Sequence, residues 1–175
     1  MDLKTGMIYS TVDGQTLKIC KVLKETMAQN GQEVDLCSID DFDGDLSRYD
    51  RIIIGASIRY GLHNKKIIDF INANKEELDS IRTAFFSVNL VARKPEKSAP
   101  DTNPYVIKFF KSIDWKPDVV EVFAGMLDYQ KYPFFDRIMI QLIMWMTKGP
   151  TNSDAKIEYT DWEKVREFGM RLSTL

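Results

Sequence analysis

The sequence predicts an α/β fold in which a parallel sheet of five strands carries helices on both faces. Short apolar runs rich in β-branched and aromatic residues alternate with segments of helical spacing, a pattern typical of βαβ units. The run at residues 51–56 is apolar almost throughout, as expected for a strand covered on both faces. With 175 residues, 44% of them apolar and 29% charged, the chain is predicted to form a single globular domain over residues 1–175.

The expected elements follow in order along the chain. Strands are predicted at residues 5–9, 33–39, 51–56, 83–89 and 119–124. Helical stripes follow the first and third strands, at Ile19, Cys20, Leu23 and Met27 and at Ile67, Ile68, Ile71 and Leu78. A last helix is predicted to begin in a capping box, Thr160-Asp161-Trp162-Glu163, and to bury Trp162, Val165, Phe168 and Leu172. About five helices result from these patterns.

A long polar loop is predicted near residues 90–103. The stretch from Ala92 to Asn103 contains two prolines and has no hydrophobic period. Asn103 is the expected N-cap of the next helix, with Pro104 as its first residue. Loops of this length inside a compact domain are often functional.

An apolar segment near residues 133–148 needs a separate explanation. The part from Ile138 to Met146 is apolar nearly all round, but it is too short to cross a bilayer, which takes about 20 residues. Two interpretations are open: a helix buried against the sheet, or a helix lying on a membrane surface. The aromatic and basic residues typical of membrane interfaces are present here: Tyr129, Lys131, Tyr132, Arg137, Trp145 and Lys148.

Charge and cysteine content limit the function classes. The formal net charge of −2 gives no overall attraction to polyanions, so no nucleic-acid partner is expected. Cys20 and Cys37 have neither metal-ligand nor C-x-x-C spacing, so we expect no metal site and a reducing, cytoplasmic compartment. The N-terminus lacks the charged-then-apolar order of a signal peptide, and export is not expected.

The loop after the first strand is a candidate phosphate site. In an open parallel sheet, ligands bind beyond the carboxyl ends of the strands. Three hydroxyls and a glycine, Ser10, Thr11, Gly14 and Thr16, lead here into a helix N-terminus, where free backbone N–H groups favour a phosphate. The alternative is that Ser10, Thr11 and Asp13 are ordinary turn and cap residues. The Asp13 carboxylate would repel a phosphate, so Asp13 is expected to contribute its backbone or to cap the helix.

The loop after the first strand and three further segments resemble known families. The loop, Thr11-Val12-Asp13-Gly14-Gln15-Thr16, is similar to the T-x-T-G-x-T phosphate loop of flavodoxins, with Asp13 in place of the middle threonine. Over nearly its whole length the chain resembles the bacterial flavodoxin-like, quinone-dependent protoporphyrinogen oxidases. Three segments carry this resemblance: Gly55-Ala56-Ser57-Ile58-Arg59-Tyr60-Gly61, Ser87-Val88-Asn89-Leu90-Val91-Ala92-Arg93-Lys94-Pro95 and Tyr159-Thr160-Asp161-Trp162-Glu163.

The resemblance implies a flavodoxin-like fold, FMN as cofactor, protoporphyrinogen IX as substrate in haem biosynthesis, and menaquinone or ubiquinone as electron acceptor. It places the FMN phosphate over residues 11–16 and the ring between the loop after Ala56 and the loop starting near Ser87. The expected cofactor-binding residues are Ser10, Thr11, Val12, Asp13, Gly14, Gln15, Thr16, Ser57, Ile58, Arg59, Tyr60, Gly61, Ser87, Val88, Asn89 and Leu90. It also favours contact of residues 133–148 with the cytoplasmic face of the inner membrane.

The charged residues around the expected ring site suggest an anionic substrate. Because arginine pairs with carboxylates bidentately, Arg59 and Arg93 are the first candidates for binding the substrate propionates, with Lys94 beside them. His63, the one histidine of the chain, is a weak candidate proton acceptor. Two competing functions stay open, a flavodoxin-type electron carrier and an NAD(P)H-dependent quinone reductase.

Overall fold

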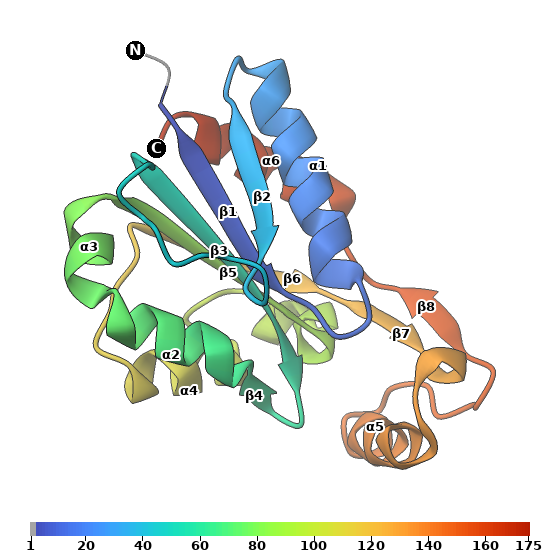
Figure 1. Ribbon diagram of the computed structural model, residues 1–175. Coiled ribbons are helices and arrows are strands. Elements are labelled where there is room, and N and C mark those ends of the chain that lie inside the picture. Colours follow the sequence, from blue (N-terminus) through green and yellow to red (C-terminus); the bar gives the residue numbers. More distant parts are fainter. Residues whose placement is uncertain (1–2) are drawn as a thin grey trace.

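The structure, a computed structural model, describes residues 3–175. Its main sheet contains five parallel strands in the order β2-β1-β3-β5-β6 (Figure 1). These strands are β1 (Thr5–Ser10), β2 (Val34–Ser38), β3 (Arg51–Arg59), β5 (Arg82–Asn89) and β6 (Val119–Ala124). A short β4 (Leu62–His63) pairs antiparallel with the end of β3. The predicted α/β class and its parallel sheet are confirmed.

Helices cover both faces of the sheet, as predicted. The side chains of α1 (Gln15–Gln29) and α6 (Trp162–Ser173) pack on one face, with Ile19, Leu23, Val165 and Phe168 in the core. On the other face lie α2 (Lys65–Ala73), α3 (Lys75–Ser80) and α4 (Pro104–Ser112), with Ile67, Ile71, Leu78 and Phe109 buried. Figure 1 shows these two helical layers on opposite sides of the strands.

The structure confirms one of the two predicted helix N-caps and contradicts the other. Asn103 caps α4 as expected, because its side chain accepts hydrogen bonds from the N–H groups of Tyr105 and Val106. The predicted capping box at the start of α6 is wrong. Asp161, not Thr160, accepts from the first helical N–H groups, while the Thr160 hydroxyl donates to the carbonyl of Ala124 at 2.7 Å. Asp161 is an equally good cap, which frees Thr160 to join the helix to β6.

The sequence patterns missed several short elements at the carboxyl end of the sheet. The strands β7 (Met126–Asp128) and β8 (Lys156–Glu158) form a separate antiparallel pair, too short to show an alternating pattern. The predicted loop near residues 90–103 contains two 3₁₀ turns, η1 (Leu90–Arg93) and η2 (Pro95–Lys97). A third turn, η3 (Tyr129–Lys131), precedes α5 (Phe134–Met146).

The apolar helix α5 lies beyond the end of the sheet, apart from the two helical layers (Figure 1). Its inner side packs Ile140 and Met144 on Leu127, Tyr129 and Tyr132. Its outer side exposes large apolar side chains: Phe134 (69%), Phe135 (78%), Ile138, Leu142, Trp145 (71%) and Met146. The interpretation of this segment as a helix buried against the sheet is therefore wrong.

Among residues 3–175, no helix combines the length and apolar character needed to span a membrane.

Candidate functional site

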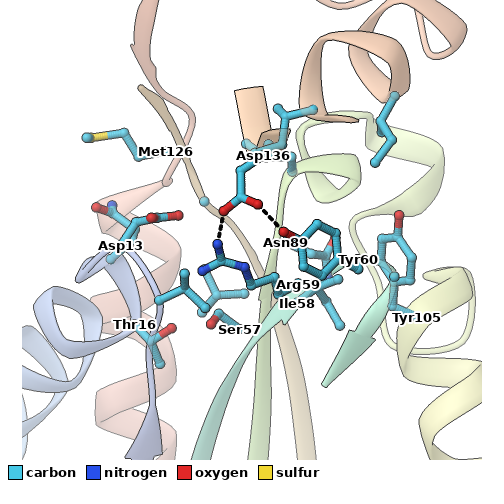
Figure 2. A pocket seen from close by; sticks show the side chains of 18 of the residues that line it. Asp13, Thr16, Ser57, Ile58, Arg59, Tyr60, Asn89, Tyr105, Met126 and Asp136 are labelled. Atoms are coloured by element: carbon cyan, nitrogen blue, oxygen red, sulfur yellow. Dashed lines mark hydrogen bonds and ion pairs between the residues drawn. The ribbon is translucent and has the colours of Figure 1, made fainter. Parts of the chain in front are cut away.

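A pocket opens at the carboxyl ends of β1, β3 and β5, under the inner side of α5 (Figure 2). The chain turns back between β1 and β3 in the strand order, and such a reversal is where open α/β sheets bind ligands. The space between its lining residues, including open solvent at its mouth, is about 950 Å³.

The loop between β1 and α1 forms the polar end of this pocket. Gly14 adopts φ 89° and precedes α1, whose first N–H groups receive no side-chain cap. The Thr11 hydroxyl accepts from the Gly14 N–H at 3.0 Å and so fixes the turn. Asp13 lines the pocket but does not cap α1, so the expectation of a capping role is wrong.

Two hydroxyls of this loop have no partner. Ser10 Oγ and Thr16 Oγ1 are buried and form no hydrogen bond with any residue in the range 3–175. A buried donor left unpaired costs about 1–3 kcal/mol, so these groups indicate a ligand with strong acceptors. Together with the uncapped N-terminus of α1, they fit a phosphate group.

The carboxyl of Asp13 sits at the rim of this pocket. Removal of water by the surrounding protein raises its pKa, and Asp128 adds to this effect, while the positive charges of Arg59 and Lys131 oppose it. The positive charges of Arg59 and Lys131 near Asp13 offset part of the negative charge that its carboxylate would bring close to a phosphate.

The turn between β3 and β4 presents an aromatic ring to the pocket. Tyr60 and Gly61 have φ values of 51° and 76°, which suits a two-residue hairpin turn with both central residues left-handed. A tyrosine in this conformation is uncommon and strained, and its side chain is 58% exposed. Figure 2 shows Tyr60 and Tyr105 on one side of the pocket, opposite Asp13 and Thr16. Such a wall suits a planar aromatic ligand.

A buried polar network supports the loop after β5. His63 Nε2 lies 2.9 Å from Ser87 Oγ, which accepts from Asn89 Nδ2 at 3.1 Å. Asn89 Oδ1 in turn accepts from Asn103 Nδ2 at 3.0 Å and from the Ala92 N–H at 3.1 Å. The side-chain amide of Asn89 is thus used inside the protein, and its carbonyl accepts from the Gly125 N–H at 3.2 Å.

His63 belongs to this network and not to the pocket lining. It is buried, and its ring packs on Phe85 and Phe109. Burial lowers its pKa to about 3, so the imidazole is neutral near pH 7 and a weak base. This placement favours a supporting role over the proton acceptor considered from the sequence.

We expect His63 to make stability pH-dependent below neutrality. The unfolded chain binds a proton near pH 6.5, whereas the folded protein does not until about pH 3, so protonation stabilises the unfolded state as pH falls through this window. The contribution is at most about 1.4 kcal/mol per pH unit. Urea unfolding between pH 4.5 and 7 should show a shallower pH slope for His63→Gln than for the wild type. Equal slopes would contradict the burial of a neutral His63.

The inner side of α5 forms the remaining wall of the pocket. Met139, Ile140 and Ile143 give it an apolar surface. Asp136, in the first turn of α5, reaches across to Arg59 and Tyr60: it forms an ion pair with the Arg59 guanidinium and accepts a hydrogen bond from the Tyr60 hydroxyl (Figure 2). These contacts join α5 to the β3–β4 turn.

Arg93 lies behind the pocket wall. Its guanidinium donates to the Leu90 carbonyl at 2.9 Å and to the Thr147 hydroxyl at 2.9 Å, and so ties η1 to the end of α5. Neither Arg93 nor Lys94 lines the pocket. Substrate binding by these two residues stays a prediction.

Most of the predicted cofactor-binding residues meet in this one pocket. Its lining includes Thr11, Val12, Asp13, Gln15, Thr16, Ser57, Ile58, Arg59, Tyr60, Gly61, Val88, Asn89 and Leu90. Three predicted residues lie outside the lining: Ser10 and Ser87 are buried beside it, and Gly14 shapes the turn. Sequence reasoning missed the lining residues Val91, Tyr105, Gly125, Met126, Tyr132, Asp136, Met139, Ile140 and Ile143. The apolar segment around 138–146 was the one available signal for the last three.

Comparisons with known proteins agree with this architecture. A model of the flavodoxin domain matches residues 6–154. An archaeal flavodoxin and the oxidised flavodoxin 1 of Bacillus cereus superpose with TM-scores of 0.55 and 0.53, each covering 98% of this chain and 97% of the other, at 12% and 16% identity. At that identity the likeness shows the fold alone.

Two curated relatives are much closer in sequence. Protoporphyrinogen IX dehydrogenase [quinone] of Escherichia coli strain K12 is 41% identical over 174 residues, covering 99% of this chain and 96% of the relative. The protein of the same name from Leishmania major is 42% identical over 175 residues, covering 98% of this chain and 75% of the relative. The flavodoxin domain implies a flavin cofactor. The chain therefore belongs to the flavodoxin-domain family and, within it, to the protoporphyrinogen IX dehydrogenases [quinone].

Proposed function

We propose that this protein oxidises protoporphyrinogen IX to protoporphyrin IX in haem biosynthesis, with FMN as cofactor and menaquinone or ubiquinone as electron acceptor. The observation that carries the proposal is the 41% identity over 99% of the chain to a protein of that activity by name. The pocket under α5 supports it, because a phosphate-type loop and an aromatic wall meet there.

The pocket fits FMN from one end to the other. The unpaired hydroxyl of Thr16 and the first N–H groups of α1 would hold the phosphate. The β3–β4 turn and the loop that starts at Asn89 would enclose the ring with backbone groups and apolar side chains. When bound, FMN supplies two-electron oxidation chemistry that neither side chains nor backbone can provide.

The protein's own residues bind and orient the tetrapyrrole. The apolar side chains of Met139, Ile140 and Ile143 cover the pocket and exclude water. Arg59, 41% exposed in its side chain, is the cation at the mouth that a propionate can reach. Because His63 is neutral and buried, the protons released by the substrate pass to solvent.

The exposed side of α5 suits a membrane surface, where quinones dissolve. Phe134, Phe135 and Trp145 project away from the protein, and Lys131 and Lys148, both exposed, flank the helix. An apolar surface of this kind with cations at its edges is typical of helices that lie in the bilayer interface. These features support the proposal that the protein lies peripherally on the cytoplasmic face of the inner membrane.

We expect the triple substitution Phe134→Ser, Phe135→Ser and Trp145→Ser to weaken binding to anionic phospholipid vesicles at least tenfold. Each aromatic side chain contributes about 1.5–3 kcal/mol when fully buried in an apolar phase, so even partial insertion exceeds this loss. Vesicle flotation measures it. Met170→Ser is the matched control, since Met170 is 51% exposed on α6. Equal binding of the triple variant and the control would contradict a membrane-facing α5.

The electron donor separates this function from an NAD(P)H-dependent quinone reductase on the same fold. The FMN-loaded protein, mixed anaerobically with NADPH in a stopped-flow spectrometer, is expected to stay oxidised. Rapid loss of flavin absorbance with NADPH would favour the reductase and count against a porphyrinogen dehydrogenase.

A further inference from the structure

Helix α5 buries a charged side chain while it exposes large apolar ones. The side chain of Asp136 is only 9% exposed, whereas Phe134 and Phe135, its neighbours in the first turn, are largely exposed. A carboxylate withdrawn from water in this way needs strong partners. It has two, the guanidinium of Arg59 and the hydroxyl of Tyr60.

Arg59 and Tyr60 form a ready-made site for a carboxylate. Arg59 provides a planar fork of N–H donors, and Tyr60 provides one O–H donor from the adjacent position. The Arg59 Cζ atom lies 5.4 Å from the centre of the Tyr60 ring, so the two side chains support each other. The tight β3–β4 turn holds both at the mouth of the pocket.

The carboxylate that fills this site belongs to the helix that covers the pocket. Asp136 lies in the first turn of α5, one turn before the wall residues Met139 and Ile140. The pairing therefore closes the mouth from the side of the β3–β4 turn. A propionate that pairs with Arg59 and Tyr60 must therefore replace the carboxylate of Asp136.

We propose that Arg59 and Tyr60 bind a substrate propionate and that Asp136 is an internal carboxylate which the propionate displaces, releasing the first turn of α5. This inference rests on the proposed function and adds the residues that select for the substrate's carboxylates. Exchange of one carboxylate for another keeps the Arg59 charge paired. The displaced Asp136 regains its hydration by moving into solvent, because it is too costly to leave unpaired in the pocket.

The exchange makes access depend on carboxylates. A ligand of the same shape without them gains nothing from Arg59 and cannot compete with Asp136. A ligand opens the site only if it binds the state in which Asp136 is displaced better than the state in which Asp136 pairs with Arg59 and Tyr60. The device therefore favours tetrapyrroles with free propionates over esterified or uncharged ones.

The test is equilibrium binding of two porphyrins to the FMN-loaded, oxidised protein. Protoporphyrin IX carries both propionates, and its dimethyl ester has the same ring without the charges. We expect Asp136→Asn to bind protoporphyrin IX about tenfold more tightly than the wild type, because a charge-assisted hydrogen bond of the competitor is lost. Its affinity for the ester should stay unchanged. Asp154→Asn, which removes the same charge from an exposed loop, is the control and should change neither.

Arg59→Gln provides the reciprocal measurement on a side chain that is partly exposed. It should weaken protoporphyrin IX binding about tenfold, leave the ester unaffected, and abolish the effect of Asp136→Asn in the double variant. Hydrogen exchange should also accelerate in residues 134–146 when protoporphyrin IX is added to the wild type, and not when the ester is added.

The results that overturn the proposal are distinct from those that overturn the function. If Asp136→Asn does not tighten diacid binding, or alters both porphyrins equally, Asp136 is a fixed anchor and the exchange is wrong, although the function stands. If the wild type binds neither porphyrin, the proposed function and this inference fail together.

Discussion

Replacing Thr16 by valine is expected to lower the affinity for FMN about tenfold to a hundredfold, since a hydrogen bond to a charged group contributes about 1.5–3 kcal/mol. The folded apoprotein should not suffer. Thr16 Oγ1 is buried without a partner in the part of the chain that the structure describes, so valine removes an unsatisfied group and keeps the shape. FMN fluorescence quenching measures the first effect, and urea unfolding of the apoprotein measures the second.

The same helix offers a matched control. Thr26 is also buried on α1, but its hydroxyl donates to the Val22 carbonyl at 2.9 Å. Thr26→Val should leave FMN affinity unchanged. If Thr16→Val binds FMN as tightly as the wild type does, the phosphate does not lie at the start of α1.

Replacing Asn103 by alanine is expected to destabilise the protein by about 2–4 kcal/mol, combining the loss of an N-cap with the loss of buried hydrogen bonds. Asn103 caps α4 and also bonds the side chain of Asn89 and, at 2.8 Å, the carbonyl of Lys97. It therefore joins the start of α4 to the end of β5 and to η2. The free energy of unfolding in urea measures the effect.

Asn64→Ala is the comparison for an ordinary cap. Asn64 caps α2 through the N–H of Lys66 and is exposed, so its loss should cost about 1 kcal/mol. Equal destabilisation by the two variants would mean that the buried network beside the pocket contributes nothing to stability.

The main sheet could be predicted from the sequence because each strand is a compact apolar run between polar segments. The run at 51–56 was the clearest, and β3 is buried at those positions, with both neighbours paired to it. Asn103 and Pro104 marked a helix start correctly because the capping signal is local. The N-cap of α6 was predicted one residue too early, at Thr160, because threonine and aspartate are both favoured at N-caps and Asp161 is the residue that caps the helix.

The site was predictable where it depends on loops that follow strands. Thr11, Tyr60 and Leu90 come from three separate loops, and the parallel sheet brings their ends together. The wall formed by α5 was not predictable in this way. Its position depends on the pairing of β7 with β8 and on contacts with Leu127 and Tyr129, which leave no periodic trace in so short a stretch.

Asp136 and Arg93 show a further limit of sequence reasoning. The sequence gives no sign of which residue will pair with a charge in an apolar helix such as Asp136, and its partner Arg59 lies 77 positions away in the chain. Arg93, chosen for its charge, turned out to hold Thr147 and Leu90. Which arginine stays near the mouth is decided by tertiary packing.

The most direct test of the account is a complete anaerobic cycle on the FMN-loaded protein. Protoporphyrinogen IX is mixed with the enzyme while flavin absorbance and porphyrin fluorescence are followed, and a quinone is then added. Because FMN accepts two electrons per round and the conversion to porphyrin takes three such rounds, the account predicts loss of the flavin absorbance on mixing. Addition of excess quinone should then restore the flavin absorbance and complete the formation of porphyrin. A flavin that stays oxidised in the presence of protoporphyrinogen IX would contradict the account and leave an electron carrier as the better description.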